Sequence, residues 1–247
     1  MLSENEETPA LNKASRGSDD TEENGNGSVG SLEEALKLAG LGKFNLWLLF
    51  VCGLGQASDA IETACISFLL PSACDLNLTS DEKGWLNATL FLGMLIGSYI
   101  SGGISDVYGR KKTLMAALMV NALAGSASSL AQEKVLFFSL RFLSGMGVGG
   151  SIPVVWTYFG EFQPPQKRGM MMSLLAVFWA LGNILASLLA LAVIPADLDH
   201  GTESFHFNSW RIFTLLCGVP TFVASLLLFA LPKVRPTNFV IRFDEND

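Results

Sequence analysis

Charged residues are scarce in this chain. Asp, Glu, Lys and Arg make up only 16% of its 247 residues, whereas hydrophobic residues make up 50%. The net charge of −7 comes largely from acidic residues before position 30, and the rest of the chain has no basic face of the kind that nucleic acid requires. This composition is typical of a membrane protein and argues against a nucleic-acid partner.

Residues that build metal sites and active sites are also few. The four cysteines are widely spaced and form neither a zinc pattern nor a disulfide framework. The only histidines, His200 and His206, fall in one predicted loop without metal-ligand spacing. No Ser/His/Asp set is visible. We therefore expect no catalytic residues, no metal site and no cofactor, and we do not expect an enzyme.

Long apolar segments dominate the remainder of the sequence. About 20 apolar residues cross a bilayer core as a helix, and six segments qualify: 44–70, 85–104, 113–131, 135–159, 170–194 and 212–231. The predicted fold class is therefore an all-α membrane protein with six transmembrane helices. Aromatic residues near the ends of these spans are predicted to anchor them at the membrane interface: Trp47, Trp85, Tyr158 and Trp210.

The segments outside the spans are polar. Residues 1–30 are acidic and rich in Gly and Ser, so they predict a disordered cytoplasmic tail and not a signal peptide. Ser31 and Glu34 have the spacing of a capping box, which predicts a short amphipathic cytoplasmic helix and lead-in over 31–43. Residues 232–247 are predicted to form a short cytoplasmic tail.

The loops predict the orientation in the membrane. The turn between the second and third spans carries Arg110, Lys111 and Lys112, and basic residues in short loops stay on the cytoplasmic side. Most other loop Lys and Arg residues fall on the same side, so we expect a multi-pass protein with both termini in the cytoplasm. Asn77, followed by Leu78 and Thr79, is a glycosylation candidate in the first outer loop.

Acidic residues inside the first span are the sharpest functional signal. Gln56, Asp59 and Glu62 recur every three residues and so share one face of a helix. An ionised Asp near the middle of a bilayer costs about 3 kcal/mol. Such residues persist where they face a cavity or meet a partner, which predicts a substrate or ion cavity along this face.

Arg141 is the only basic residue deep within a span, in the fourth apolar segment. It needs an anion, and Asp59 and Glu62 are the only acids at membrane depth. We therefore predict that Arg141 approaches Asp59, Glu62 or both, and we include it in the cavity. The pair either serves function or only fixes the helix register, because a buried ion pair adds little net stability.

Glycines at four-residue spacing predict close helix packing in the second and fourth spans. Small residues at this spacing let two helices approach closely, and the contact is either static or able to slide. The residues concerned are Gly93, Gly97, Gly145 and Gly149.

Several motifs, in order along the chain, carry a resemblance to a known family. They are the turn residues Gly102, Asp106, Gly109, Arg110 and Lys111, the run from Arg141 through Gly145 to Gly149, the set Tyr158, Glu161, Arg168 and Gly169, and the pair Trp210 and Arg211. Over residues 31–231 the chain resembles the N-terminal half of a major facilitator superfamily transporter. Within that superfamily it is most similar to the synaptic vesicle glycoprotein 2-related and sugar-porter-like organic-solute transporters.

The resemblance implies a fold and a function. The chain would be one half of a twelve-helix fold that binds substrate between its halves and works by alternating access. It implies a symporter or facilitator of a small organic solute, an ion or a sugar, with Asp59 and Arg141 coupling proton movement. It also places Asp106 and Arg110, together with Glu161 and Arg168, in a cytoplasmic gate.

The chain also departs from the family pattern after the sixth span. Relatives continue with Pro-Glu-Ser-Pro, whereas Pro232 is followed here by Lys233 and the chain stops at Asp247. We expect a product truncated after the sixth span, in a vesicle or plasma membrane, that needs a second six-span half or a homodimer partner. The alternative is a non-transporting form that acts as a vesicle-membrane interaction or regulatory protein.

Overall fold

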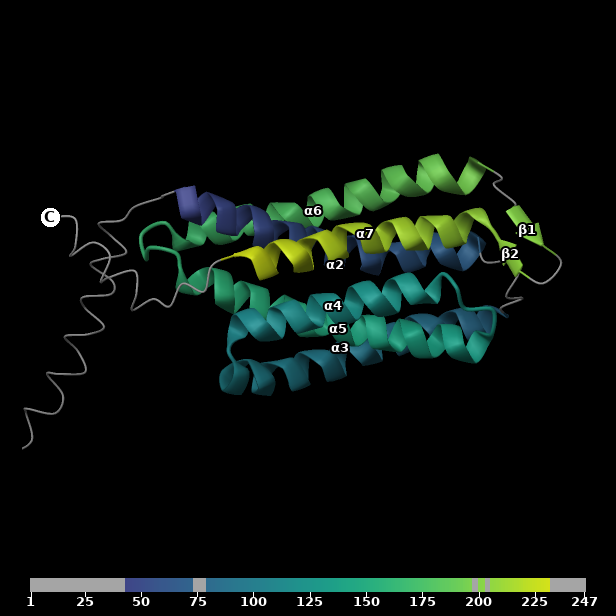
Figure 1. Cartoon of the computed structure of the whole chain (residues 1–247), viewed down its shortest axis with the longest axis horizontal. Coiled ribbons are helices and arrows are strands. Elements are labelled where there is room, and N and C mark those ends of the chain that lie inside the picture. Colours follow the sequence, from purple (N-terminus) through teal and green to yellow (C-terminus); the bar gives the residue numbers. More distant parts are fainter. Residues whose placement is uncertain (1–42, 73–78, 197–199, 203–204, 232–247) are drawn as a thin grey trace, which may run out of the picture. The chain divides into compact units, whose positions relative to one another are not determined.

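The computed structural model describes residues 43–72, 79–196, 200–202 and 205–231. Six long helices fill these ranges (Figure 1): α2 Lys43–Ser72, α3 Ser80–Tyr108, α4 Arg110–Ser128, α5 Lys134–Glu161, α6 Arg168–Val193 and α7 Ser209–Ala230. The predicted all-helical fold with six long helices is thus confirmed. The predicted tails, the segment 31–42 and the sequon residue Asn77 lie outside the described residues.

A feature that was not predicted lies between α6 and α7. A 3-10 turn, Ile194–Ala196, follows α6, and two short antiparallel strands come next, β1 His200–Thr202 and β2 Phe205–Phe207. The two histidines pair in register with Phe207 and Gly201 of the opposite strand. This hairpin changes the loop but not the helical class of the chain.

α3 extends beyond its apolar segment because a polar cap begins it. α3 starts at Ser80, five residues before the predicted span, with Thr79 as its N-cap. The Glu82 N–H donates to the Thr79 hydroxyl at 3.3 Å, and the Thr79 N–H donates to the Glu82 carboxylate at 2.8 Å. This reciprocal capping box satisfies two amides at the start of the helix, so the helix begins before the apolar run does.

Five of the described helices are long and apolar enough to cross a membrane: α2, α3, α5, α6 and α7. The third predicted span, α4, forms as a helix of 19 residues. Its first turn is Arg110, Lys111 and Lys112, and Ala, Ser and Asn lower its apolar content. α4 packs against α5 and α7 within the bundle, so neighbouring helices cover much of its less apolar surface.

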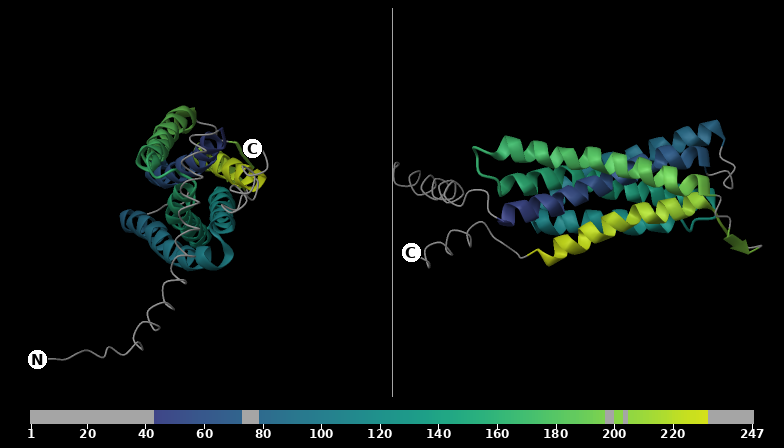
Figure 2. Two further views of the ribbon diagram at one scale, coloured as in Figure 1. Left: turned by 90° about the vertical axis from the view of Figure 1, so that its left-hand side faces the viewer. Right: turned by 90° about the horizontal axis from the view of Figure 1, so that it is seen from above.

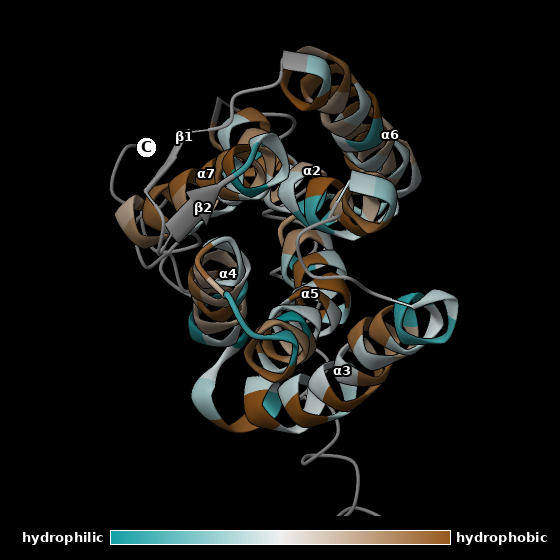
Figure 3. Ribbon diagram, turned by 90° about the vertical axis from the view of Figure 1, so that its right-hand side faces the viewer, coloured by the Kyte–Doolittle hydropathy of each residue, from teal (hydrophilic) through white to brown (hydrophobic). Residues whose placement is uncertain are grey.

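The packing repeats after three helices. α3 and α4 pack against α5, and in the same way α6 and α7 pack against α2. Contacts of α4 with α7 and of α2 with α5 join the two sets. Figure 3, which looks along the bundle, shows α2, α6 and α7 on one side and α3, α4 and α5 on the other, and Figure 2 shows the helices running alongside one another. The same contacts recurring in two sets of three helices are the pattern of an internal repeat, as found in membrane transporters.

Glycines make the α3–α5 contact possible. A Cβ atom at Gly97 would lie 2.1 Å from the Met146 carbonyl oxygen, and one at Gly149 would lie 2.0 Å from the Met94 carbonyl oxygen. The other two predicted packing glycines are equally constrained, with backbone oxygens 2.3 Å from a Cβ at Gly93 and 2.4 Å from one at Gly145. The two backbones therefore touch over two helical turns.

The equivalent contact between α2 and α6 uses the same device. A Cβ atom at Gly182 would lie 2.3 Å from the Ala57 carbonyl oxygen, and one at Gly53 would lie 2.6 Å from the Phe178 ring. Within each three-helix set, two helices thus approach closely because glycines at the contact lack side chains. Close backbone approach is a means of association that does not depend on excluding water, which suits a lipid environment.

The interior has two apolar clusters with a polar layer between them. The first cluster lies toward the N-terminal end of α2 and includes Leu48, Leu118, Phe159 and Leu228. The second lies toward the other end and includes Ile61, Phe137, Trp210 and Phe213. In sequence, Asp59 of α2 and Asn121 of α4 fall between members of the two clusters, as do the buried polar residues of α5 from Arg141 to Ser151, and Glu62 directly follows Ile61 of the second cluster.

Two of the predicted interfacial anchors are core residues instead. Trp47 and Trp85 are exposed, at 48% and 70%, as a membrane anchor requires. Trp210 is only 2% exposed and Tyr158 only 7%. Trp210 packs edge-on against Phe137, and Tyr158 packs edge-on against Phe162. Position near a span end did not distinguish these buried rings from rings at the membrane surface.

We predict that Gly149→Ala destabilises the bundle. The new methyl group meets a backbone carbonyl that cannot move aside, and such overpacking costs about 1–3 kcal/mol, more than the gain of up to about 1 kcal/mol from replacing a helical Gly. Thermal unfolding in detergent micelles measures the change. Gly103→Ala is the matched control, because no atom lies within 4 Å of its added Cβ. Equal unfolding temperatures for the two variants would contradict the prediction.

Candidate functional site

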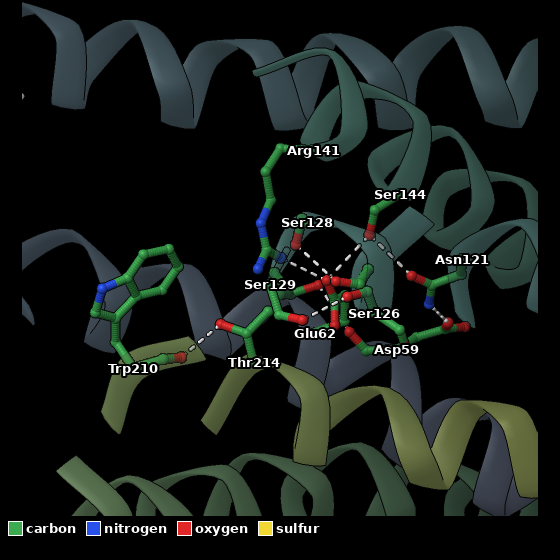
Figure 4. Close-up of polar contacts among 12 residues, drawn as sticks. Asp59, Glu62, Asn121, Ser126, Ser128, Ser129, Arg141, Ser144, Trp210 and Thr214 are labelled. Atoms are coloured by element: carbon green, nitrogen blue, oxygen red, sulfur yellow. Dashed lines mark hydrogen bonds and ion pairs between the residues drawn. The ribbon is translucent and has the colours of Figure 1, made fainter. Parts of the chain in front are cut away.

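A network of buried polar side chains occupies the layer between the two apolar clusters (Figure 4). Three helices supply it, and every member is at most 1% exposed. The members are Asp59 and Glu62 from α2, Asn121 from α4, and Arg141, Ser144 and Ser151 from α5. A buried polar group is costly unless it is hydrogen-bonded, so the partners of each residue define what the site can do.

Arg141 pairs with Glu62. Its Nη1 lies 2.5 Å from Glu62 Oε1, and both side chains are at most 1% exposed. The Arg141 guanidinium also lies over the Phe137 ring, 5.5 Å from its centroid. Gly125 on α4 makes room for the carboxylate, because a Cβ atom there would be 2.9 Å from Glu62 Oε1. Of the two acids proposed as partners, the structure joins Glu62 to Arg141.

Asp59 has a different environment. Its Oδ1 accepts a hydrogen bond from Asn121 Nδ2 at 3.1 Å, and its Oδ2 accepts one from the Ser151 hydroxyl. Among the residues that the structure describes, Asp59 has no ion pair. The two acids of one helix face therefore differ: Arg141 balances the charge of Glu62, whereas only neutral donors contact Asp59.

Ser144 and Asn121 connect the two acids. The Ser144 hydroxyl lies 3.1 Å from Glu62 Oε1 and 2.9 Å from Asn121 Oδ1. Its single proton can serve one of these acceptors at a time. Asn121 contacts Asp59 through its Nδ2, so the path from Asp59 to Arg141 runs through an amide, a hydroxyl and a carboxylate.

Sequence reasoning missed the neutral members of this network. Ser144 and Ser151 follow Arg141 by three and ten residues, which places them on its helix face. Asn121 is the only amide side chain in the third predicted span. The sequence did contain a signal for these residues, because they are uncharged polar residues within predicted spans and two of them lie at helical spacing from Arg141. The site prediction considered mainly the charged residues.

The predicted cavity residues lie inside the helix bundle. Gln56 is 1% exposed, like Asp59 and Glu62, and Arg141 is fully buried. In the described ranges, Gln56 Nε2 and the Nε and Nη2 atoms of Arg141 have no hydrogen-bond partner. Arg141 thus keeps N–H donors that its pair with Glu62 does not use. The two oxygens of a second carboxylate could accept hydrogen bonds from them.

The turn at Gly109, which belongs to the loop motif described above, separates α3 from α4. Gly109 has φ +91°, a conformation that favours glycine, and its N–H donates to the Ser105 carbonyl at 3.0 Å. Directly after it, Arg110 Nη1 lies 2.6 Å from Glu161 Oε1, at the end of α5. Both side chains are partly exposed, at 34% and 43%, so solvent weakens this pair and makes it readily reversible.

The other predicted gate residues are placed as follows. Asp106 is exposed and has no ion pair within the described ranges, and Gly102 has no neighbour within 4 Å of an added Cβ. Arg168 begins α6 and lines a cavity of about 370 Å³ together with Glu161. The resemblance places Glu161 and Arg168 in one gate with Arg110, and in this structure Glu161 forms its ion pair with Arg110. Lys111 donates to the Leu231 carbonyl instead of joining this pair.

The opposite end of the bundle is held by a cap and a second ion pair. Arg211, 1% exposed, donates through Nη1 to the Ser129 carbonyl at 2.9 Å and the Ala131 carbonyl at 2.7 Å. These carbonyls follow the last turn of α4, where helical partners are missing. Lys134 contacts Glu82 at 2.9 Å, which joins the starts of α5 and α3. Sequence analysis treated Arg211 only as part of a motif at the membrane boundary.

Known proteins share this arrangement. The chain resembles the xylose transporter XylE from E. coli in its inward-open conformation, with a TM-score of 0.68 and 20% identity over 82% of this chain and 53% of that one. It also resembles a bacterial homologue of the human lysosomal transporter Spinster, with a TM-score of 0.70 and 16% identity over 79% of this chain and 47% of that one. The fold is therefore that of about half of each of these proteins.

The sequence comparisons agree with the fold. Residues 52–244 match the family model of the Major Facilitator Superfamily. Synaptic vesicle glycoprotein 2B of Mus musculus is 39% identical over 219 residues, 87% of this chain and 32% of that protein. Synaptic vesicle glycoprotein 2A of Homo sapiens is 38% identical over 205 residues, 81% of this chain and 28% of that protein. The chain spans about a third of the length of these relatives.

The chain belongs to the major facilitator superfamily, a family of membrane transporters, and is related to the synaptic vesicle glycoprotein 2 proteins. It is a multi-pass membrane protein that contains one six-helix half of the family fold. The resemblance drawn from its motifs is confirmed.

We predict that Arg141→Met strongly destabilises the bundle. The substitution leaves Glu62 buried without its cation, and breaking a buried pair in this way costs about 3–5 kcal/mol. The double variant Glu62→Met with Arg141→Met removes both charges and should recover most of that loss. Unfolding titrations in mixed micelles measure all three proteins. A double variant no more stable than Arg141→Met alone would show that Arg141 stabilises the fold by something other than its pair with Glu62.

Proposed function

We propose that the chain forms one half of a transport unit that moves a small organic solute by alternating access, coupled to protons at Asp59. One observation carries the proposal: the fully buried carboxylate of Asp59 lies at membrane depth with only neutral hydrogen-bond partners, three residues before Glu62 of a buried Arg–Glu pair. Ionisable residues inside a membrane are expensive, and they mark ion and proton pathways in transporters.

The proton step follows from the contrast between the two acids. Glu62 has a cation partner, so its charge is balanced without a proton. Asp59 has none in the described part of the chain, and an ionised carboxylate there costs about 2.5–3.5 kcal/mol. Binding a proton removes that cost. Loss of the proton creates a charge whose natural counter-ion is the guanidinium of Arg141, which has unused donors.

Such a change would alter the contact between α2 and α5, because Asp59 belongs to one helix and Arg141 to the other. These are the helices on which the two three-helix sets pack. A change of partner at Arg141 therefore acts where the two three-helix sets meet, and a small shift there can be passed to the rest of the bundle. Asn121 and Ser144 would hold the two acids in register during the exchange.

A second part of the transport cycle would involve the ion pair of Arg110 and Glu161. We place this pair in a gate at the end that the basic turn predicts to be cytoplasmic, together with Asp106 and Arg168. Its partial exposure supports this role, since a gate contact must break in each cycle. The solute would bind against a second six-helix half, in a vesicle or plasma membrane.

We predict that Asp59→Asn abolishes proton-coupled solute accumulation. The chain is reconstituted into liposomes with an imposed pH gradient and tested with three probes: glucose, tetraethylammonium and para-aminohippurate. These represent the sugar, organic cation and organic anion classes. The wild-type chain should accumulate one of them against its gradient, whereas Asp59→Asn should only equilibrate it, because an amide carries no titratable proton.

Asp81→Asn is the matched control, since it makes the same chemical change at an exposed position before the span. It should accumulate the probe like the wild type. Gradient-driven accumulation by Asp59→Asn would rule out Asp59 as the proton site. If cross-linking shows dimers and yet no probe moves in any variant, an interaction or regulatory role in the membrane is favoured over transport.

A further inference from the structure

A second kind of site lies away from the polar network, where α4 begins and α7 ends. A cavity of about 430 Å³ is lined there by Lys111, Lys112, Met115, Phe229 and Leu231. Two lysines stand at one side of this cavity, and apolar side chains form the rest. The motifs assigned to the gate do not account for this mixture, because Lys112, Met115 and Phe229 belong to none of them.

The polar side of the cavity is positively charged. Lys111 donates to the Leu231 carbonyl, which holds its ammonium group at the cavity and satisfies a carbonyl at the end of α7. Lys112 is exposed beside it, and the first turn of α4 contains no acidic residue. The positive end of the α4 helix dipole adds to the potential. The neighbouring Arg110 is balanced by Glu161, whereas Lys112 has no ion pair with any residue that the structure describes and adds its charge to the cavity.

The apolar side of the cavity continues as a stripe along α7. Phe229 is 72% exposed, Leu226 is 50% exposed and Phe222 is 43% exposed. Their spacing of three and four residues places them on one face of the helix. The stripe therefore runs from the lysines toward the middle of the membrane. A soluble anion would use the lysines but would have no use for these side chains.

We propose that this cavity binds the headgroup of an anionic phospholipid, with one acyl chain lying along the stripe of Phe222, Leu226 and Phe229. Basic pockets between transmembrane helices bind anionic headgroups when they lie at the level of the lipid phosphates, and Lys111 and Lys112 lie where α4 meets the end of the bundle. The site is independent of solute transport. It assigns to Lys112 and Phe229 a role that neither the fold nor the gate requires.

The purified full chain in detergent micelles tests this site. Phosphatidylserine, phosphatidylcholine or inorganic phosphate is titrated in, thermal unfolding is recorded, and native mass spectrometry counts the lipids retained. Phosphatidylserine should raise the unfolding temperature and stay bound, whereas the other two should not. Lys112→Gln should weaken phosphatidylserine binding about five-fold, which corresponds to about 1 kcal/mol for one lysine near a lipid surface. Phe229→Ala should weaken it several-fold through lost acyl contact.

Lys167→Gln is the matched control. Lys167 is an exposed lysine just before α6, on the same side of the membrane by the predicted topology, and it does not line the cavity. Its replacement should leave phosphatidylserine binding unchanged. Equal losses for Lys112→Gln and Lys167→Gln would overturn the proposal in favour of general surface attraction. Equal protection by inorganic phosphate, or an unaltered affinity in Phe229→Ala, would overturn the lipid assignment. Lys112 and Phe229 are exposed, so both variants are expected to fold.

Discussion

The buried ion pair between Glu62 and Arg141 is the interaction on which the remaining structure depends. It joins α2 to α5, the two helices around which the other four are arranged. Neither charge could stay at this depth alone, so each helix requires the other. Ser144 and the space left by Gly125 support the carboxylate. In the same layer Asn121 and Ser151 hold Asp59. The apolar clusters above and below this layer keep its hydrogen bonds from competing with water.

Around this pair the chain uses one packing scheme twice. α3 meets α5 through glycines that let backbone touch backbone, and α6 meets α2 in this manner at Gly182, while Gly53 makes room for the Phe178 ring. The ion pairs at the ends differ in kind from the central one. Arg110 with Glu161 and Lys134 with Glu82 are partly exposed and therefore weak. The half thus has a fully buried ion pair in its middle and partly exposed ion pairs at its two ends.

Much of this could be predicted from the sequence, because lipid imposes strong rules. Apolar length identified six helices, the basic turn at Arg110 identified the loop, and the cost of a lone charge required an acidic partner for Arg141. The predictions that were wrong or incomplete concern which neighbour a side chain contacts. The sequence does not show whether Trp210 faces lipid or the core. Nor does it show that Asn121 contacts α5, because that depends on how α4 and α5 pack. The choice of Glu62 over Asp59 depends on the rotation of α2 against α5, which spacing along one helix does not contain.

The depth of the polar layer has an electrical consequence. Asp59 is the seventeenth of the thirty residues of α2, close to the middle of the helix. A proton that reaches it from either side therefore crosses roughly half of the membrane field, and a full crossing corresponds to about 2.3 kcal/mol per 100 mV. In the proton-coupled role proposed for Asp59, its occupancy by a proton would depend on membrane voltage by about 1 kcal/mol per 100 mV, in addition to any dependence on pH. A carboxylate in that role would respond to both components of the proton-motive force.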